Sequence, residues 1–427
     1  MRHLQNIDLP FTLNASYAVT APQWLRIRDV LKGSDAVKLA GTEYLPQLSG
    51  QDDDEYKAYK KRAVFFNITS RILSTNSGVI VRRTPSIEYN DRLAYYFEDD
   101  RIDKVTFHEL FRYSVREVIS TGRVGILVDV MNDKPAIHKF PTESILNWEM
   151  NLDGSIKQIL LMSTETTLDP ITFEEVSVKV FYRLHLVNEV YSITKYDDTG
   201  TPKGTTQPSV HGRTLKYIPF TCITTFGLDL EPVKSPILEI VDLNLSHYLS
   251  SADLEHGRHF VGCPQPYITG GTSEVKLRVG SEVAWVVPNE KAKVGYLEFL
   301  GAGLSSLTDA LKEKQSQISQ FSAQLMDTST RGSEAEGTVR MRYSSDAANL
   351  SDIALSVESG LGEVYNTIAD WLNVDNPTIV LNKDFISTKM SYQELNALTK
   401  SLVDKAITPE IFMYNLERGE MLPPENQ

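Results

Sequence analysis

The sequence predicts an α+β protein, because two kinds of hydrophobic periodicity occupy different parts of the chain. Between residues 136 and 228, short apolar runs such as Val176–Tyr182 alternate with the two-residue period of strands. Between residues 235 and 371, three long segments repeat apolar residues every three or four positions, as helices do. A strand-rich insert separates the first two helical segments. We therefore expect a mixed α/β body, a long helical hairpin and a small strand-containing tip.

The first 135 residues predict helices that lead into a strand. A single amphipathic helix is expected over 52 to 74, where the acidic start Asp52–Glu55 complements the helix dipole. A second helix, Phe107–Ile119, leads through Thr121 and Gly122 into the apolar strand Val124–Val130. The β-rich segment 136–228 follows, with Asp197–Gly200 as one of its turns.

The first two long helices predict a hairpin. The first is assigned to 235–263, because Ser235 and Pro236 form an N-cap followed by a proline at the first helical position. The second, 303–326, carries an apolar stripe that Lys314 interrupts once; its members are Leu304, Leu307, Leu311, Ile318, Phe321 and Leu325. The insert 264–302 between the helices contains a predicted strand, Val283–Val287.

A loop and a third helix come next. Residues 327–337 include no large apolar side chain, so we expect this loop to project from the helices; an ordinary surface turn is the alternative. The third helix is assigned to 338–375 from the pattern that ends at Trp371. In residues 376–427 we expect the strand Thr378–Leu381, a helix from Ser391 with Glu394 completing a capping box, and a short helix from Thr408 and Pro409.

Composition narrows the class of protein. The chain has 427 residues and 41% hydrophobic content, and none of its apolar runs approaches the roughly 18 to 20 residues needed to cross a bilayer, so we expect no membrane association. The N-terminus lacks the apolar core of a signal peptide, and the two cysteines, Cys222 and Cys263, have no disulfide or CxxC spacing, which favours a reducing cytoplasm. The net charge of -13 argues against a broad basic face that grips nucleic acid and permits a surface along which DNA slides.

Motifs for enzymatic chemistry are missing from the sequence. It contains no P-loop, no GxSxG elbow, no HExxH helix and no EF-hand loop, so we expect neither an enzyme nor a bound cofactor, and ATP hydrolysis must come from another protein. The acidic run Asp52–Glu55 could hold two Mg²⁺ ions, but neighbouring helix residues point apart, and a solvated helix start is the preferred interpretation.

Two histidine-containing sets are further candidates for a chemical role. His256, His259 and Cys263 would need a fourth zinc ligand, and the two histidines more simply complement a helix C-terminus. His108, Glu109 and His185 have no ligand or triad spacing, so they are interpreted as packing or surface residues.

Several segments, in their order along the chain, resemble the portal proteins, or head-tail connectors, of tailed double-stranded DNA bacteriophages. They are Tyr44–Gly50, Asp52–Tyr56, Tyr59–Ala63, Ser120–Asp129 and residues 235–270, and each one alone is a weak signal. The resemblance implies a portal fold with these parts: wing 1–234, first stem helix 235–263, clip 264–302, second stem helix 303–326, tunnel loop 327–337, long wing helix 338–375 and short helical crown 376–427.

The function that this resemblance implies is a ring of twelve copies at one capsid vertex. Its channel would pass double-stranded DNA, without sequence specificity, during packaging and ejection. Its partners would be the terminase large subunit, the major capsid or scaffolding protein and later a head-tail adaptor. Such a protein belongs to the virion and occupies the host cytoplasm during assembly.

The same resemblance assigns roles to residues. The residues expected to contact DNA in the tunnel loop are Thr328, Ser329, Thr330, Arg331 and Ser333, and those expected to line the channel are Lys312, Lys314, His256, His259 and Arg340. The residues expected to act in clip docking or subunit pairing are Lys276, Arg278, Glu282, Lys291 and Lys293. Those expected to pack the stem are Leu304, Leu311, Ile318, Phe321 and Leu325. Two alternatives stay open. A metal-dependent nuclease or phosphoesterase built on Asp52–Glu55 would show metal-stimulated activity, and a non-DNA ring or adaptor would lack a channel of DNA width.

Overall fold

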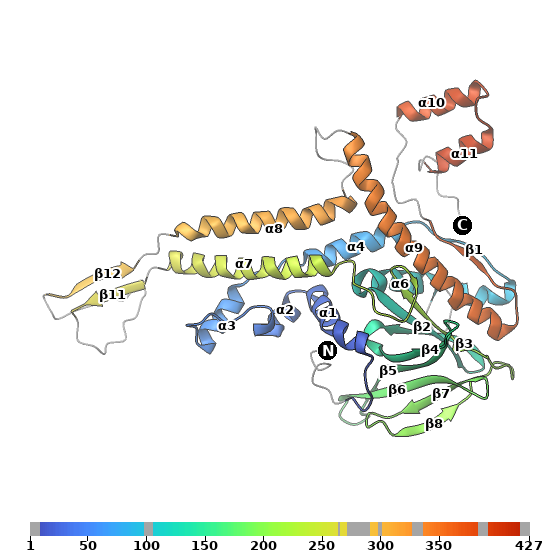
Figure 1. Ribbon diagram of the computed structural model, residues 1–427. Helices are drawn as coiled ribbons and strands as arrows, with labels where there is room; N and C mark the ends of the chain where they lie inside the picture. Colours follow the sequence, from blue (N-terminus) through green and yellow to red (C-terminus); the bar gives the residue numbers. More distant parts are fainter. Residues whose placement is uncertain are drawn as a thin grey trace.

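The computed structural model describes residues 9–97, 106–263, 265–270, 291–297, 301–326, 336–382 and 392–418. It confirms the expected α+β class, with a mixed body from which a long helical hairpin extends (Figure 1). None of the helices in these ranges is long and apolar enough to span a membrane.

The N-terminal part is helical but more divided than the sequence predicted. The expected single helix over 52 to 74 is wrong: α3 (Asp53–Arg62) ends, and α4 (Ile68–Val81) begins after a short extended link. The link persists because Asn67 caps α4 by accepting from the Ser70 N–H at 3.0 Å, while Phe65 in the link is buried. Preceding and following elements are α1 (Ala15–Lys32), α2 (Ser34–Ala40), η2 (Gly41–Glu43), β1 (Ser86–Glu88), η3 (Asp91–Leu93) and α5 (Ala94–Phe97).

A four-stranded antiparallel sheet forms the centre of the body. Its strand order is β10-β9-β2-β3, and α6 (Phe107–Thr121) leads directly into β2 (Arg123–Met131), which confirms the predicted helix-to-strand unit. Gly122 allows the sharp change of direction, because it caps α6 with a φ of 88°, a conformation that favours glycine. The other strands are β3 (Lys134–Pro141), β9 (Phe220–Thr224) and β10 (Gly227–Leu228).

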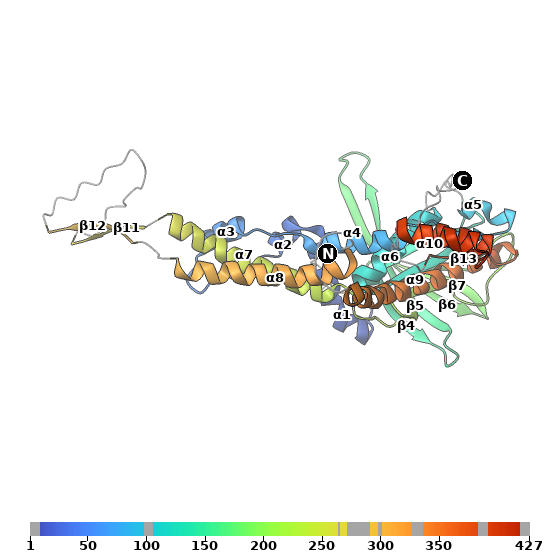
Figure 2. The same cartoon turned by 90° about the horizontal axis from the view of Figure 1, so that it is seen from above.

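A second antiparallel sheet of five strands, in the order β4-β5-β6-β7-β8, makes up most of the predicted β-rich segment. Its strands are β4 (Ile145–Met150), β5 (Ile156–Leu168), β6 (Glu175–Val187), β7 (Val190–Tyr196) and β8 (Pro202–Thr206), and η4 (Thr142–Ser144) precedes it. β5 and β6 are 13 residues each, longer than their neighbours. Their far ends therefore form a two-stranded hairpin, the pale green one that rises from the upper edge of the body in Figure 2.

The helical hairpin, called the arm below, consists of α7 (Leu238–Gly262), β11 (Gln265–Thr269), β12 (Lys293–Leu297) and α8 (Ala302–Met326). The two helices lie side by side and carry the β11–β12 pair at the end far from the body (Figure 1). α7 begins three residues later than predicted. The Ser235 hydroxyl accepts from the Ile237 N–H at 3.2 Å, as an N-cap does, and donates to the Ser120 carbonyl at 2.6 Å, so it also fastens the entry of α7 to α6.

The long helix α9 (Glu336–Leu372) crosses the body and supplies much of its core. Trp371 donates its indole N–H to the Val128 carbonyl at 3.2 Å, and Gly360 lies so close to β9 that an added Cβ would be 2.3 Å from Ile223. β13 (Thr378–Val380) then pairs with β1, and α10 (Tyr392–Val403) and α11 (Pro409–Arg418) follow. The predicted strand Val283–Val287 and the Ser391 cap lie outside the described residues.

A buried arginine connects the layers of the body. Arg123 is fully buried and lies over the rings of Trp24 and Trp148, 5.2 and 4.8 Å from their centroids. Its guanidinium donates to the Thr142 hydroxyl at 2.9 Å and to backbone carbonyls that include that of Leu230. Burial lowers its pKa, and the carbonyl acceptors compensate for lost water.

Candidate functional site

The arm is the feature that most clearly calls for a functional explanation. Each of its helices has 25 residues, which corresponds to a length of about 37 Å. Close packing holds them together: an added Cβ at Gly257 of α7 would be 2.6 Å from Leu304 Cδ2 of α8. Ile318 is 1% exposed, and Leu304 and Leu311 are half-buried. These three residues therefore lie on the packed face of α8.

Lys314, which interrupts the apolar stripe, points into the arm. Its ammonium group donates to the Ser250 hydroxyl at 2.6 Å and to the Ser246 carbonyl at 3.1 Å, both on α7. A half-buried ammonium needs such acceptors, and two turns of α7 supply them. Lys314, one of the residues expected to line a channel, lies in the single chain at the interface between α7 and α8.

A histidine that the sequence analysis missed lies beside this lysine. His247 of α7 is 1% exposed; its Nε2 is 3.3 Å from the Gln315 side-chain nitrogen, and its ring meets that of Phe66 edge to face. Burial, and then the charge of Lys314, lower its pKa. Nothing in the local sequence indicated this position, because the contacts come from α8 and from the link before α4.

The helix α3 braces the outer half of α7. Tyr59 donates its hydroxyl proton to Asp253 at 2.6 Å, and its ring lies 5.0 Å from that of His256. Arg62 lies 3.3 Å from His256 Nδ1. Burial, and then Arg62, lower the pKa of His256. His256 therefore faces α3 and not the free side of the arm, where a channel-lining residue was expected; His259 is exposed.

The acidic run Asp52–Glu55 serves as a helix start. Asp52 accepts from the Glu55 N–H at 2.8 Å, and Glu55 accepts from the Asp52 N–H at 3.2 Å, so the two form a capping box. Asp54 pairs with Lys57 at 2.8 Å. Across the part of the chain that the structure describes, no three His, Cys, Asp or Glu side chains gather closely enough to hold a metal ion. His108 is exposed on α6 and His185 is half-buried on β6.

The free surface of the arm combines neutralised charge with exposed apolar side chains. On α8, Lys312 pairs with Asp309 at 3.5 Å, and both are well exposed. Near the far end, large apolar side chains reach solvent; they are Phe260, Val261, Tyr267, Val294 and Tyr296. Lys291 and Lys293 are exposed beside them. This end of the arm has the composition of a protein contact surface.

Some of the residues predicted to act lie outside what the structure describes. These are Thr328, Ser329, Thr330, Arg331 and Ser333 of the expected tunnel loop, and Lys276, Arg278 and Glu282 of the expected clip. The backbone of Arg340, Phe321 and Leu325 is helical, but their side chains are also outside the description.

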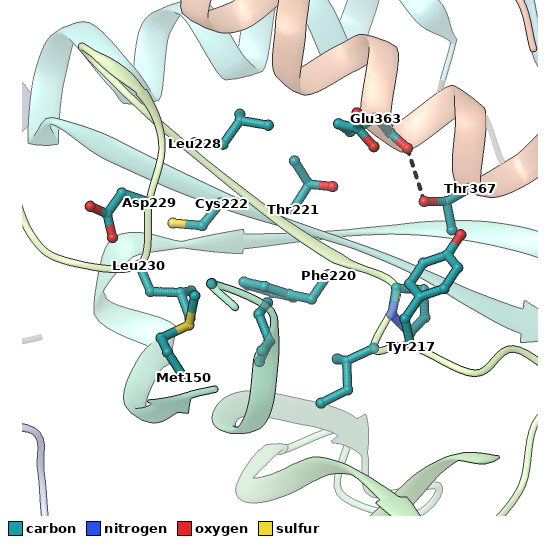
Figure 3. Close-up of a pocket in the computed structure, with 14 residues that line it drawn as sticks. Met150, Tyr217, Phe220, Thr221, Cys222, Leu228, Asp229, Leu230, Glu363 and Thr367 are labelled. Carbon is teal, nitrogen blue, oxygen red and sulfur yellow. Dashed lines mark hydrogen bonds between the residues drawn. The ribbon is translucent and has the colours of Figure 1, made fainter. Parts of the chain in front are cut away.

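A cavity of about 260 Å³ opens in the body where β9 and β10, the β4–β5 turn and α9 meet (Figure 3). Its lining combines apolar side chains, among them Met150, Phe220 and Leu228, with polar ones such as Asp229 and Glu363. On α9, Thr367 donates to the Glu363 carbonyl at 2.9 Å, and nearby Tyr217 donates to Asp370 at 2.5 Å. This volume is below the roughly 300 Å³ at which small-molecule sites begin, so the cavity suits a side chain better than a substrate.

Comparison with known proteins gives a limited result. A family model described as a domain of unknown function, DUF4055, matches residues 236–372, which span α7 to α9. Among solved structures, the neck of an empty GTA particle computed with C6 symmetry is similar with a TM-score of 0.40 and 10% identity, over 88% of this chain and 95% of that one. The neck of a native GTA particle computed with C12 symmetry gives a TM-score of 0.38 and 10% identity, over 84% and 90%. No curated protein sequence matches this chain.

Proposed function

We propose that this chain is a portal-type head-tail connector of a phage-like particle. In this proposal twelve copies form a ring at one capsid vertex, and the ring is a channel for double-stranded DNA. The terminase large subunit, the capsid or scaffolding protein and a head-tail adaptor are its partners, and the protein has no enzymatic activity of its own. The copy number and the partners come from the resemblance of the sequence segments to portal proteins.

The observation that carries the proposal is the arm. The two helices of the arm pack on each other and are braced along part of their length by α3 and α4, yet the arm extends about 37 Å and ends in a two-stranded sheet. Exposed apolar side chains such as Tyr267, Val294 and Tyr296 lie at its far end, where they contact water in a single chain. Lateral packing against arms of other copies would bury them, and a closed ring gives every arm two neighbours.

The charge of the arm agrees with a channel that does not retain DNA. A surface that binds phosphates tightly needs several unpaired cations. On α8, Lys312 pairs with Asp309 and Lys314 is turned into the arm. A ring of twelve copies would also carry twelve times the net charge of -13. An acidic channel lining would repel the DNA backbone and permit sliding.

The direct test is mass photometry and cryo-electron microscopy of the purified protein. We expect rings of about twelve subunits with an axial hole wide enough for a DNA duplex. A chain that remains a monomer or dimer at micromolar concentration would refute the proposal, and a ring too narrow for a duplex would favour the alternative of a non-DNA adaptor.

A matched pair of variants tests the role of the arm. Val294→Asp places a carboxylate at the far end of the arm, and Val380→Asp does the same on β13; the two valines are 52% and 47% exposed. We expect Val294→Asp to reduce ring formation at least tenfold and Val380→Asp to leave it unchanged. Equal behaviour of the two would show that the far end of the arm is not a contact between copies.

The proposed tunnel loop is tested by deleting residues 328–335. Rings should still assemble, because the packed face of α8 does not include this loop, while DNA retention or packaging should fail. A metal-stimulated nuclease activity that disappears in Asp52→Asn would instead support the alternative built on the acidic run.

A further inference from the structure

The hairpin formed by the far ends of β5 and β6 projects from the body and is not part of the arm. All residues from Thr164 to Val178 are exposed except Asp169, which is half-buried, so both faces of this two-stranded segment contact solvent. A two-stranded ribbon is only marginally stable in water and is an uncommon shape without a partner. Large apolar side chains at its end add to this cost: Ile171 is 86% exposed and Phe173 is 74% exposed.

The turn at the end of the hairpin, called the hairpin tip below (residues 168–175), is held in one conformation by its own hydrogen bonds. Asp169 Oδ1 accepts from the N–H groups of Ile171 and Thr172, at 2.8 Å each. The Asp169 carbonyl accepts from the Phe173 N–H at 2.9 Å, and the Asp169 N–H donates to Glu174 at 2.9 Å. Ile171 and Phe173 are therefore presented from an ordered turn. An ordered element loses little entropy when it binds.

The ribbon behind the tip has two different faces. Val176 lies opposite Thr167 and Val178 lies opposite Glu165, so the two valines share one face. On the other face, Thr166 and Ser177 make a cross-strand hydrogen bond at 3.0 Å. The face with the two valines adjoins the hairpin tip and also carries Thr167 and Glu165, so the continuous apolar part of this element is the tip itself.

A complementary feature lies at the other end of the same strand. Ile156, the first residue of β5, lines the cavity of about 260 Å³, and Leu168, the last residue, begins the hairpin tip. At about 3.3 Å per residue, 13 residues separate these ends by roughly 40 Å. The hairpin, which projects from the body in Figure 2, therefore cannot fold back into the cavity of its own chain. In the proposed ring it would be free to contact a neighbouring copy.

We infer that the hairpin tip of one copy inserts Ile171 and Phe173 into the cavity of the neighbouring copy. The inference rests on the proposed ring, for which it names a contact in the body in addition to the arm. The contact joins two different surfaces, the tip of one copy and the cavity of the next, and head-to-tail contacts of this kind generate closed rings when the rotation closes. A cavity smaller than a small-molecule site fits one or two anchor side chains.

Charges around the cavity define the orientation. Glu174 and Glu175 flank the tip, while Asp229 and Glu363 are among the residues that line the cavity. Like charges repel in a desolvated contact, so the tip carboxylates stay at the solvent edge and only the apolar side chains enter.

Disulfide crosslinking tests the contact directly. In a Cys263→Ser background, Ile171→Cys is combined with Leu228→Cys at the mouth of the cavity, and assembled rings are oxidised. We expect a ladder of covalent multimers up to the full ring. Cys222 lines the same cavity, so a product that joins residue 171 to Cys222 counts in the same way. Rings that give no ladder would overturn the inference.

Substitution of an anchor side chain gives an independent readout. Phe173→Asp and, as matched control, Val19→Asp change apolar residues that are each 74% exposed, on the hairpin and on α1. We expect Phe173→Asp to raise the concentration for half-maximal ring assembly at least tenfold, with an unchanged circular dichroism spectrum, and Val19→Asp to have no effect. If wild-type protein forms rings and Phe173→Asp forms them equally well, the inference fails while the ring proposal stands. If wild-type protein forms no ring at all, the proposed function itself fails.

Discussion

Truncating Ile318 is expected to loosen the arm without unfolding the body. Ile318 is 1% exposed in α8, a helix that contacts α7, α4 and α9. Ile318→Ala removes three carbon atoms, which at about 0.8 kcal/mol per buried methylene is about 2.4 kcal/mol before the cavity left behind is counted. Buried isoleucine-to-alanine changes cost about 2 to 5 kcal/mol in total, so about 3 kcal/mol is a central expectation.

Hydrogen exchange is the suitable assay, because it reports local opening in a chain with several structural parts. At 1.4 kcal/mol for each factor of ten, 3 kcal/mol corresponds to a roughly hundredfold faster exchange of the α8 amides. The more conservative Ile318→Val should cost about 1 kcal/mol and give about a fivefold effect. Ser316→Ala, at an exposed position two residues away, is the control. If Ile318→Ala exchanged no faster than Ser316→Ala, the assignment of Ile318 to the packed face would be wrong.

Two further predictions concern buried titratable groups. Burial lowers the folded-state pKa of His247, so the unfolded chain binds this proton more readily than the folded chain. The contribution of His247 to the free energy of unfolding is therefore complete above the ordinary histidine pKa of about 6.5 and is lost as the pH falls below it. In urea titrations between pH 7.5 and 5.5, His247→Gln should make the free energy of unfolding less dependent on pH. Arg123→Met removes the donor to Thr142 and to several carbonyls, and leaving these acceptors unpaired should cost about 3 to 5 kcal/mol of unfolding free energy. The control Arg183→Met, at an exposed position on β6, should change the urea midpoint little.

The sequence predicted the elements whose periodicity is long and regular. The helices around Leu304 and Leu361 repeat their apolar residues over many turns, and the structure places α8 and α9 there. The predicted cap Ser235 does accept from the Ile237 N–H, but the regular helix begins at Leu238, and the bond from Ser235 to Ser120, 115 residues away, could not be predicted from local sequence. The helix break after Arg62 was missed for a different reason. The Asn67 cap is a local signal, but the apolar pattern continues across it and so predicted one helix.

The contacts of the candidate site were predicted less well than its elements. Helical spacing placed Leu304 and Ile318 on one stripe, and they do lie on the packed face of α8. The direction of Lys314 depends on acceptors in α7, and the environment of His256 depends on α3, which lies about 194 residues earlier in the chain. Long-range partners of this kind leave no mark in the local sequence. The exposed hairpin was likewise hidden, because its valines follow the same alternation as buried strands.

The close approach of α9 to the central sheet implies that two distant positions are coupled. At Gly360 a methyl group would overlap Ile223, whose side chain is itself fully buried and has little space to move. Gly360→Ala alone should therefore be harmful, and a smaller residue at 223 should relieve it, so the two substitutions are not additive. Among natural variants of this chain, a larger residue at 360 should occur together with a smaller one at 223, and this covariation would record the helix-to-sheet contact without any structure.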